Sequence, residues 1–157
     1  MNVQAIFGLQ FLLSLVVWSV VAAVFMGPRL GRMSARDALM WLSLPHAFRH
    51  VGMVFLVPGM NAQALPASFA VPAAYGDLFA GLLALASIVA LRANWRGALA
   101  LVALFNVVGT LDLANALRHV DIAPSFGATW YIPTMLVPLL LVTHAMMIKR
   151  LIALRRA

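Results

Sequence analysis

The sequence predicts an all-α polytopic integral membrane protein, a bundle of five transmembrane helices in a single domain over residues 1–157. Three observations predict this class. Hydrophobic residues make up 64% of the chain and charged residues 10%, whereas an ordinary soluble domain has about 25% charged residues. Five stretches approach the length of about 20 apolar residues that a spanning helix needs. The basic residues gather in alternate loops, which is typical of membrane proteins.

The five expected helices differ in how clearly the sequence defines them. The first has no basic segment before it and is too long for the apolar part of a secretory signal, so we expect it to be retained. The second contains Pro45 and several ionisable residues, and the third is short. Pro133 and Pro138 should bend the fifth. The expected ranges are Val3–Met26, Ala38–Pro58, Ala74–Leu91, Ala98–Leu117 and Trp130–Ile152.

The positions of the positive charges predict an orientation. The loops after helices 2 and 4 contain a single basic residue, Arg118. The other basic residues outside the helices form clusters in the loops after helices 1 and 3 and in the C-terminal tail. Five crossings place these clusters on one side, with the N-terminus outside and the C-terminus in the cytoplasm. The clusters contain Arg29, Arg32, Arg36, Arg92, Arg96, Lys149, Arg150, Arg155 and Arg156.

This charge pattern also argues that the second helix crosses fully, because omitting it would divide the basic clusters between the two sides. The net charge of +7 is therefore interpreted as a topology signal, and we expect no nucleic-acid partner. The use of alanine and arginine is typical of a bacterial inner-membrane protein. We expect a multi-pass protein of the cell membrane, with the bacterial inner membrane as its location.

The second helix carries the most informative polar pattern of the chain. Arg49 lies between His46 and His50, in the middle of a segment that is otherwise apolar. A charge at the centre of a bilayer costs roughly 2.5–3.5 kcal/mol, so these side chains should face the protein interior. On a regular α-helix, Ser43, His46, Arg49 and His50 fall within an arc of about 120°. The pattern predicts a buried polar site on this face.

Other polar residues at similar depths are candidate partners for this stripe. An arginine–carboxylate pair is the expected way to neutralise a charge within a membrane. We therefore expect Arg49 to pair with Asp112 in helix 4 or with Asp77 at the start of helix 3. The candidate ligand- or proton-binding residues are His46, Arg49, His50, Asp77, Asn106, Asp112 and His144.

The histidines also allow a haem or a divalent metal ion as a cofactor, whose identity the sequence leaves open. His46 and His50 have the i,i+4 spacing that can chelate one metal ion, and His144 or Asp112 would be a third ligand. We expect His46 and His144 at the same depth, so haem ligation would join His144 to His46 or His50. Arg49 argues against this reading because it repels cations. The absence of cysteine excludes thiolate ligands.

Four functional classes follow from these patterns. The one we favour is a buried polar site that binds or transports a small solute or ion, with proton coupling through histidines, which titrate near neutral pH, and Asp112. The alternatives are an accessory membrane subunit whose polar groups only assemble the bundle, a membrane-embedded enzyme with a lipid-phase substrate, and a haem or metal protein. No nucleophile motif specifies the chemistry of an enzyme.

The expected partners are the lipid bilayer and the small solute or ion. Helix 3 also has Gly76, Ala80 and Ala84 at four-residue spacing. Small residues at this spacing let helices approach closely. They predict close packing either within the chain or in a homo-oligomer.

Overall fold

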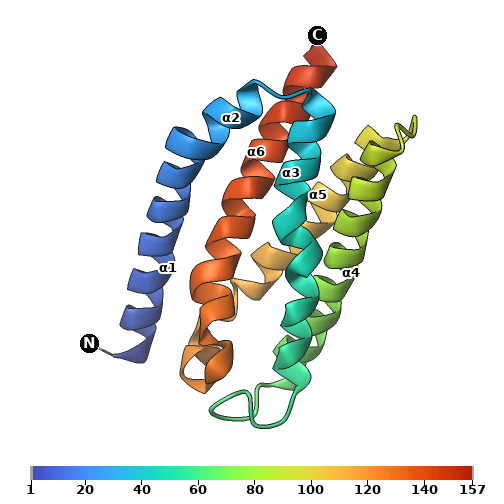
Figure 1. Cartoon of the computed structure of the whole chain (residues 1–157). Helices are drawn as coiled ribbons and strands as arrows, with labels where there is room; N and C mark the ends of the chain where they lie inside the picture. The colour runs from blue at the N-terminus through green and yellow to red at the C-terminus, as the bar shows by residue number, and fades with distance from the viewer. Residues whose placement is uncertain (1, 157) are drawn as a thin grey trace.

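The computed structural model describes residues 2–156, and within this range the chain forms helices and no strand. Successive segments run in alternating directions through one bundle, and the termini lie at opposite ends of it (Figure 1). The elements are α1 (Val3–Val21), the π-helical turn η1 (Ala22–Met26), α2 (Gly27–Gly31), α3 (Ala35–Ala47), the 3-10 helix η2 (Phe48–Leu56), α4 (Ala67–Arg92), α5 (Ala98–Ala116), the 3-10 turns η3 (Val120–Ser125) and η4 (Ala128–Trp130), the π-helical turn η5 (Ile132–Leu136) and α6 (Val137–Arg156).

Four helices among the described residues are long and apolar enough to cross a membrane: Val3–Gly31, Ala67–Arg92, Ala98–Ala116 and Ala128–Arg156. They correspond to the first, third, fourth and fifth predicted helices. α4 begins well before the predicted start at Ala74, because the expected loop before it folds into the helix. The second predicted helix is not one of the four. Its α-helical part, α3, has only 13 residues and then continues in another helical form.

That change of form occurs beside the polar residues. η2 is a 3-10 helix, in which each residue turns the chain by about 120° and every third residue shares a face. The buried residues of η2 follow this period: they are Arg49, Gly52 and Phe55. Phe48 and Val51, one position earlier in each turn, are exposed. The 3-10 geometry therefore sends one polar side chain, that of Arg49, into the bundle.

His50 does not share the face of His46, which corrects the prediction from the helical wheel. The wheel assumed about 100° per residue throughout, whereas the tighter turn from Phe48 onward carries His50 further round the axis. His46 is completely buried, but His50 is exposed. Its Nδ1 atom lies 3.1 Å from the carbonyl oxygen of Ala47, and its ring lies beside that of the exposed Phe48.

Two hydrophobic clusters enclose the middle of the bundle from its two ends. Along the α3–η2 segment, residues of one cluster come before Arg49 and a residue of the other comes after it. Along α4, Asp77 also lies between residues of the two clusters. The polar residues therefore lie between two apolar layers. The first cluster includes Leu39, Leu42, Val102, Phe105 and Met147, and the second includes Phe7, Phe55, Phe69, Ile122 and Phe126.

The small residues of α4 are used for packing within the chain. Ala80 and Ala84 have no exposed surface, and Gly81 lies against the backbone of the α3–η2 segment at His46 to His50. Ala80 and Ala84 are therefore covered by contacts within the chain. The homo-oligomer contact through Gly76, Ala80 and Ala84 stays a prediction.

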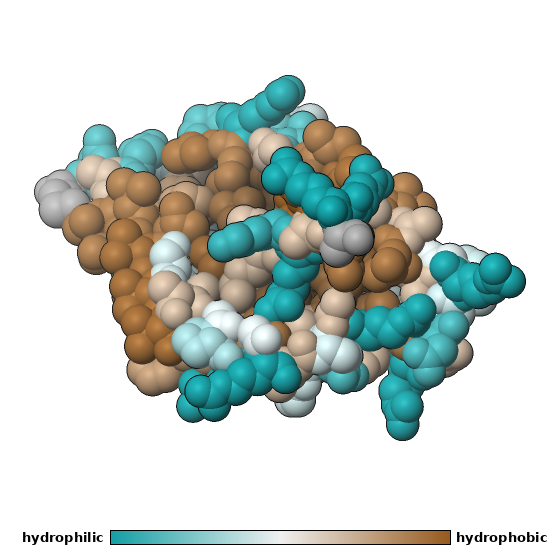
Figure 2. All heavy atoms as spheres, turned by 90° about the horizontal axis from the view of Figure 1, so that it is seen from above, coloured by the Kyte–Doolittle hydropathy of each residue, from teal (hydrophilic) through white to brown (hydrophobic). Residues whose placement is uncertain are grey.

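One end of the bundle carries almost all of the basic residues. In Figure 1 this end holds α2, the start of α3 and the C-terminal end of α6. Figure 2, viewed onto the same end, shows hydrophilic side chains spread across it, with hydrophobic surface between them and along one side. We call it the basic end, and it comprises Arg29, Arg32, Arg36, Arg92, Arg96, Lys149, Arg150, Arg155 and Arg156.

Candidate functional site

Arg49 is the centre of the buried polar site. Its Nε donates to Asp77 Oδ1 at 2.8 Å, and Nη2 donates to Asp112 Oδ2. Nη1 donates to the backbone carbonyl of Gly109 at 3.2 Å. The guanidinium therefore bridges α4 and α5 from its position on η2. The predicted ion pair is confirmed, and Arg49 pairs with both candidate carboxylates rather than with one.

The charges of this cluster do not cancel. Arginine stays protonated in proteins, so one positive charge faces two carboxylates, which together carry two negative charges when ionised. The Arg49 side chain has no exposed surface, whereas those of Asp77 and Asp112 are 13% and 17% exposed. The carboxylates thus have free surface on the side away from the arginine. This surplus negative charge can be balanced by a proton or a cation.

Three glycines allow the polar groups to approach this closely. A Cβ atom at Gly52 would overlap the Asp77 carboxylate, and one at Gly76 would overlap the Asp112 carboxylate. A Cβ at Gly109 would lie 2.8 Å from His144 Nε2 and 2.9 Å from Arg49 Nη1. Each glycine thus leaves the space that a charged or aromatic side chain of another helix fills. The sequence pattern gave no indication of Gly52 or Gly109.

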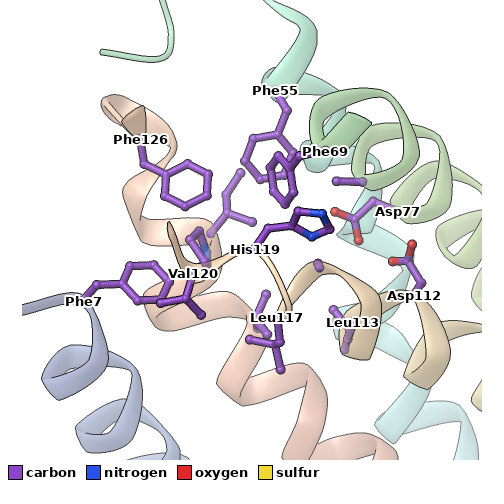
Figure 3. Close-up of a pocket in the computed structure, with 15 residues that line it drawn as sticks. Phe7, Phe55, Phe69, Asp77, Asp112, Leu113, Leu117, His119, Val120 and Phe126 are labelled. Atoms are coloured by element: carbon purple, nitrogen blue, oxygen red, sulfur yellow. The ribbon is translucent and has the colours of Figure 1, made fainter. Parts of the chain in front are cut away.

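Asp77 and Asp112 face a small cavity in the half of the bundle away from the basic end. Its volume is about 40 Å³, enough for a few water molecules. Figure 3 shows the two carboxylates on one side of the cavity and Phe7 and Phe126 on the other. The lining also includes Phe55, Phe69, Leu113, Leu117, His119, Ile132 and Pro133.

Sequence reasoning missed the aromatic lining of this cavity. Phe7, Phe69 and Phe126 come from segments far apart in the chain, and the Phe7 and Phe126 rings are stacked 6.2 Å apart. The Phe69 ring lies 5.6 Å from that of His119. In an apolar sequence these phenylalanines resemble lipid-facing residues, so no local pattern distinguishes them. Only the path of the chain brings them to the carboxylates.

A second polar group lies on the side of Arg49 toward the basic end. The rings of His46 and His144 are 4.1 Å apart, which confirms that the two histidines lie at the same depth. His144 Nδ1 is 3.0 Å from Asn106 Oδ1. Because Asn106 Nδ2 donates to the carbonyl of Val102, the Asn106 oxygen is the acceptor. His144 therefore carries its proton on Nδ1.

His46 is held by a hydroxyl group of α6. Its Nε2 lies 2.9 Å from Thr143 Oγ1, and that hydroxyl is also within hydrogen-bond distance of the carbonyls of Leu139 and Leu140. The other ring nitrogens, His46 Nδ1 and His144 Nε2, have no hydrogen-bond partner among residues 2–156. Since His144 and Arg49 both lie against Gly109, the polar groups continue from the cavity to His46.

The predicted metal site of His46, His50 and His144 is not assembled, because η2 turns His50 to the outside. Among the described residues, no three histidine, aspartate or glutamate side chains are placed to hold a metal ion. Haem between His46 and His144 does not fit either. Their rings are in van der Waals contact, which leaves no space for a porphyrin between them. The donor set therefore fits neither cofactor.

Replacing Asn106 by leucine tests the interpretation of the histidine pair. We expect the free energy of unfolding to fall by about 1–3 kcal/mol, because the buried His144 Nδ1–H would lose its acceptor. Equilibrium unfolding in mixed detergent and SDS micelles measures this change. Asn115→Leu is the matched control, since Asn115 is exposed on the same helix, and it should change stability little. Equal effects of the two substitutions would contradict the assigned hydrogen bond.

A protein-family model matches residues 6–152, almost the whole described chain, and its description is a domain of unknown function, DUF8737. Comparison with curated proteins found no match, and comparison with solved structures found none. The functional conclusion therefore depends on the chemistry of the buried site.

Proposed function

The chain belongs to the DUF8737 family, and we propose that it binds a proton or a small monovalent cation at Asp77 and Asp112 and carries it across the membrane. The proposed topology has five crossings, with α3 and η2 together forming the second. The N-terminus is outside and the basic end faces the cytoplasm of a bacterial cell. In this orientation the carboxylate cavity lies in the outer half of the membrane.

The length of the second crossing supports this topology. α3 has 13 residues and η2 has nine, and at rises of about 1.5 and 2.0 Å per residue they span about 37 Å. The hydrocarbon core of a bilayer is about 30 Å thick. The five-crossing arrangement also keeps the basic residues on one side, as the positive-inside rule requires.

The observation that carries the proposed function is the unequal pairing of Arg49 with two carboxylates. An ionised carboxylate within a membrane is costly unless it is paired or faces a polar cavity. One carboxylate can be paired with Arg49, and the charge of the other is left for a proton or a cation. The cavity volume of about 40 Å³ limits the ligand to a proton with water, or to a cation of few atoms.

Transport needs access from the second side, and two irregular segments are the proposed moving parts. Toward the basic end the polar site is covered by Leu42, Phe105 and Met147. η2 is a nine-residue 3-10 helix, and a 3-10 stretch of this length often marks a hinge. The π-helical turn η5 contributes Ile132 and Pro133 to the cavity. Both segments contact the site directly.

Proton and cation movement into liposomes tests the proposal. Purified protein is reconstituted with an internal pH-sensitive dye or, in parallel, an internal sodium-sensitive dye, and a potassium diffusion potential drives uptake, alone and with sodium, ammonium or methylammonium present. We expect proton or cation-coupled flux in the original protein and at least a tenfold loss in Asp112→Asn. This substitution leaves Arg49 paired with Asp77, so the surplus charge is removed while the ion pair is kept.

The matched control is Asp121→Asn, because Asp121 is exposed in η3 and does not line the cavity. This control should keep the original flux. No dye response under any of these conditions would overturn the transport proposal and favour a purely structural role for the ion pairs. Equal flux in Asp112→Asn and the original protein would remove Asp112 from the mechanism.

A further inference from the structure

A second concave site lies between the first and last helices, on the membrane-facing side of the bundle. Its volume is about 650 Å³. On one wall, Ala22, Ala23 and Gly27 come from the π-helical turn η1 and the start of α2, and the other wall is formed by α6. The full lining consists of Ser19, Ala22, Ala23, Gly27, Val142, Ala145, Met146, Lys149, Arg150 and Ala153. We call this the α1–α6 slot.

The slot is bounded by two attachments of the N-terminal helix to the bundle. On the side away from the basic end, Trp18 Nε1 donates to the carbonyl oxygen of Met135 at 3.2 Å. Toward the basic end, Leu30 is buried in the first hydrophobic cluster and Met26 packs against it. Between these attachments, Ala23 and Ala145 are exposed. The slot is therefore a gap held between fixed points.

The charge on its lining is entirely positive. Lys149 and Arg150 line the slot from the C-terminal half of α6, and none of the described lining residues is acidic. The chain has only four acidic residues in all, and Asp77 and Asp112 are paired with Arg49 on the other side of α6. Arg29 Nη1 donates to the carbonyl oxygen of Phe25, one turn earlier in the same helix, at 2.9 Å. The two α6 cations thus lack an anionic partner among the residues that line the slot.

We propose that the α1–α6 slot binds an anionic phospholipid, with its phosphate at Lys149 and Arg150 and one acyl chain along the small residues of η1 and α2. Basic pockets between transmembrane helices on the cytoplasmic side characteristically hold anionic lipid head groups. An apolar gap that opens to the bilayer is filled by lipid tails, since an empty gap forfeits dispersion contacts. This inference requires the membrane location of the helices and is independent of cation binding at Asp112.

The experiment measures which lipids remain with the protein. The full chain is reconstituted in vesicles of equimolar phosphatidylglycerol and phosphatidylethanolamine, extracted in mild detergent, and analysed by native mass spectrometry. We expect the original protein to retain phosphatidylglycerol preferentially. The double variant Lys149→Gln/Arg150→Gln should lose about 30-fold of this preference, as expected for the loss of two positive charges at a membrane surface.

Two further variants separate a specific slot from general attraction of lipid to the basic end. Arg92→Gln/Arg96→Gln removes the same charge from the end of α4 and the turn that follows it, outside the slot, and should retain phosphatidylglycerol as the original protein does. Ala145→Leu fills the slot from an exposed position and should reduce retention of both lipids. Equal retention of the two lipids by the original protein would overturn the proposal. It would also be overturned if the two double variants lost the preference for phosphatidylglycerol equally, or if lipid retention were unchanged in Ala145→Leu.

Discussion

Replacing Arg49 by leucine is expected to lower the free energy of unfolding by about 3–5 kcal/mol, the cost of removing one partner from a buried ion pair. Leucine fills part of the volume but leaves Asp77 and Asp112 facing each other without a cation. The carbonyl of Gly109 also loses its donor. Equilibrium unfolding in mixed detergent and SDS micelles measures the effect, and the yield of monodisperse protein gives a second readout.

A second variant separates the effect of the unpaired buried carboxylates on stability from the effect of altered packing. The triple variant Arg49→Leu/Asp77→Asn/Asp112→Asn has no buried charge in the cluster, and we expect it to recover most of the lost stability. Arg92→Leu is the control for removal of an exposed arginine and should stay within about 0.5 kcal/mol of the original protein. If Arg49→Leu is no more harmful than Arg92→Leu, the ion-pair cluster does not hold the bundle together.

The substitution Gly109→Ala is expected to destabilise the protein by about 1–3 kcal/mol through overpacking. The added methyl group would lie 2.8 Å from His144 Cε1 and Nε2 and 2.9 Å from Arg49 Nη1. None of these groups can move easily, because His144 is fixed by Asn106 and Arg49 by two carboxylates. We also expect the proteoliposome flux to fall, because the guanidinium must shift.

Gly8→Ala is the matched control, since Gly8 lies within α1 and nothing would contact its added Cβ within 4 Å. Alanine is favoured over glycine within a helix by roughly 0.5–1 kcal/mol, so this variant should be slightly more stable. The same unfolding measurement is applied to both variants, and the expected changes in the free energy of unfolding have opposite signs. A stabilising Gly109→Ala would contradict the close contact between α5, His144 and Arg49.

The parts of the fold that the sequence predicted are those that follow from hydropathy and charge. Four predicted helices match helices long and apolar enough to cross a membrane. The pairing of Arg49 was predictable because a buried guanidinium needs a carboxylate and the sequence has few. The common depth of His46 and His144 followed from their positions along their helices. Each of these inferences needed only the position of a residue along a helix.

The parts that could not be predicted depend on local backbone form and on packing between helices. Hydropathy does not distinguish an α-helix from a 3-10 helix. An α-helical wheel therefore predicts His50 on the same face as His46, whereas η2 turns His50 outward. The start of α4 was missed because residues 67–73 include Pro72 and directly follow Pro66. The aromatic cavity joins Phe7, Phe69 and Phe126, which no spacing rule connects.

The 3-10 form of η2 has a mechanical consequence for the cavity. If its nine residues rewound as an α-helix, the segment would shorten by about 4.5 Å, close to the pitch of one α-helical turn. Counted from Ala47, Arg49 would rotate by only about 40° but Phe55 by roughly 160°. This rewinding would withdraw the Phe55 ring from the cavity wall while the Arg49 guanidinium stayed near its carboxylates. The distance between the Phe55 and Phe126 rings, 6.0 Å in this state, is where the rewinding would register first.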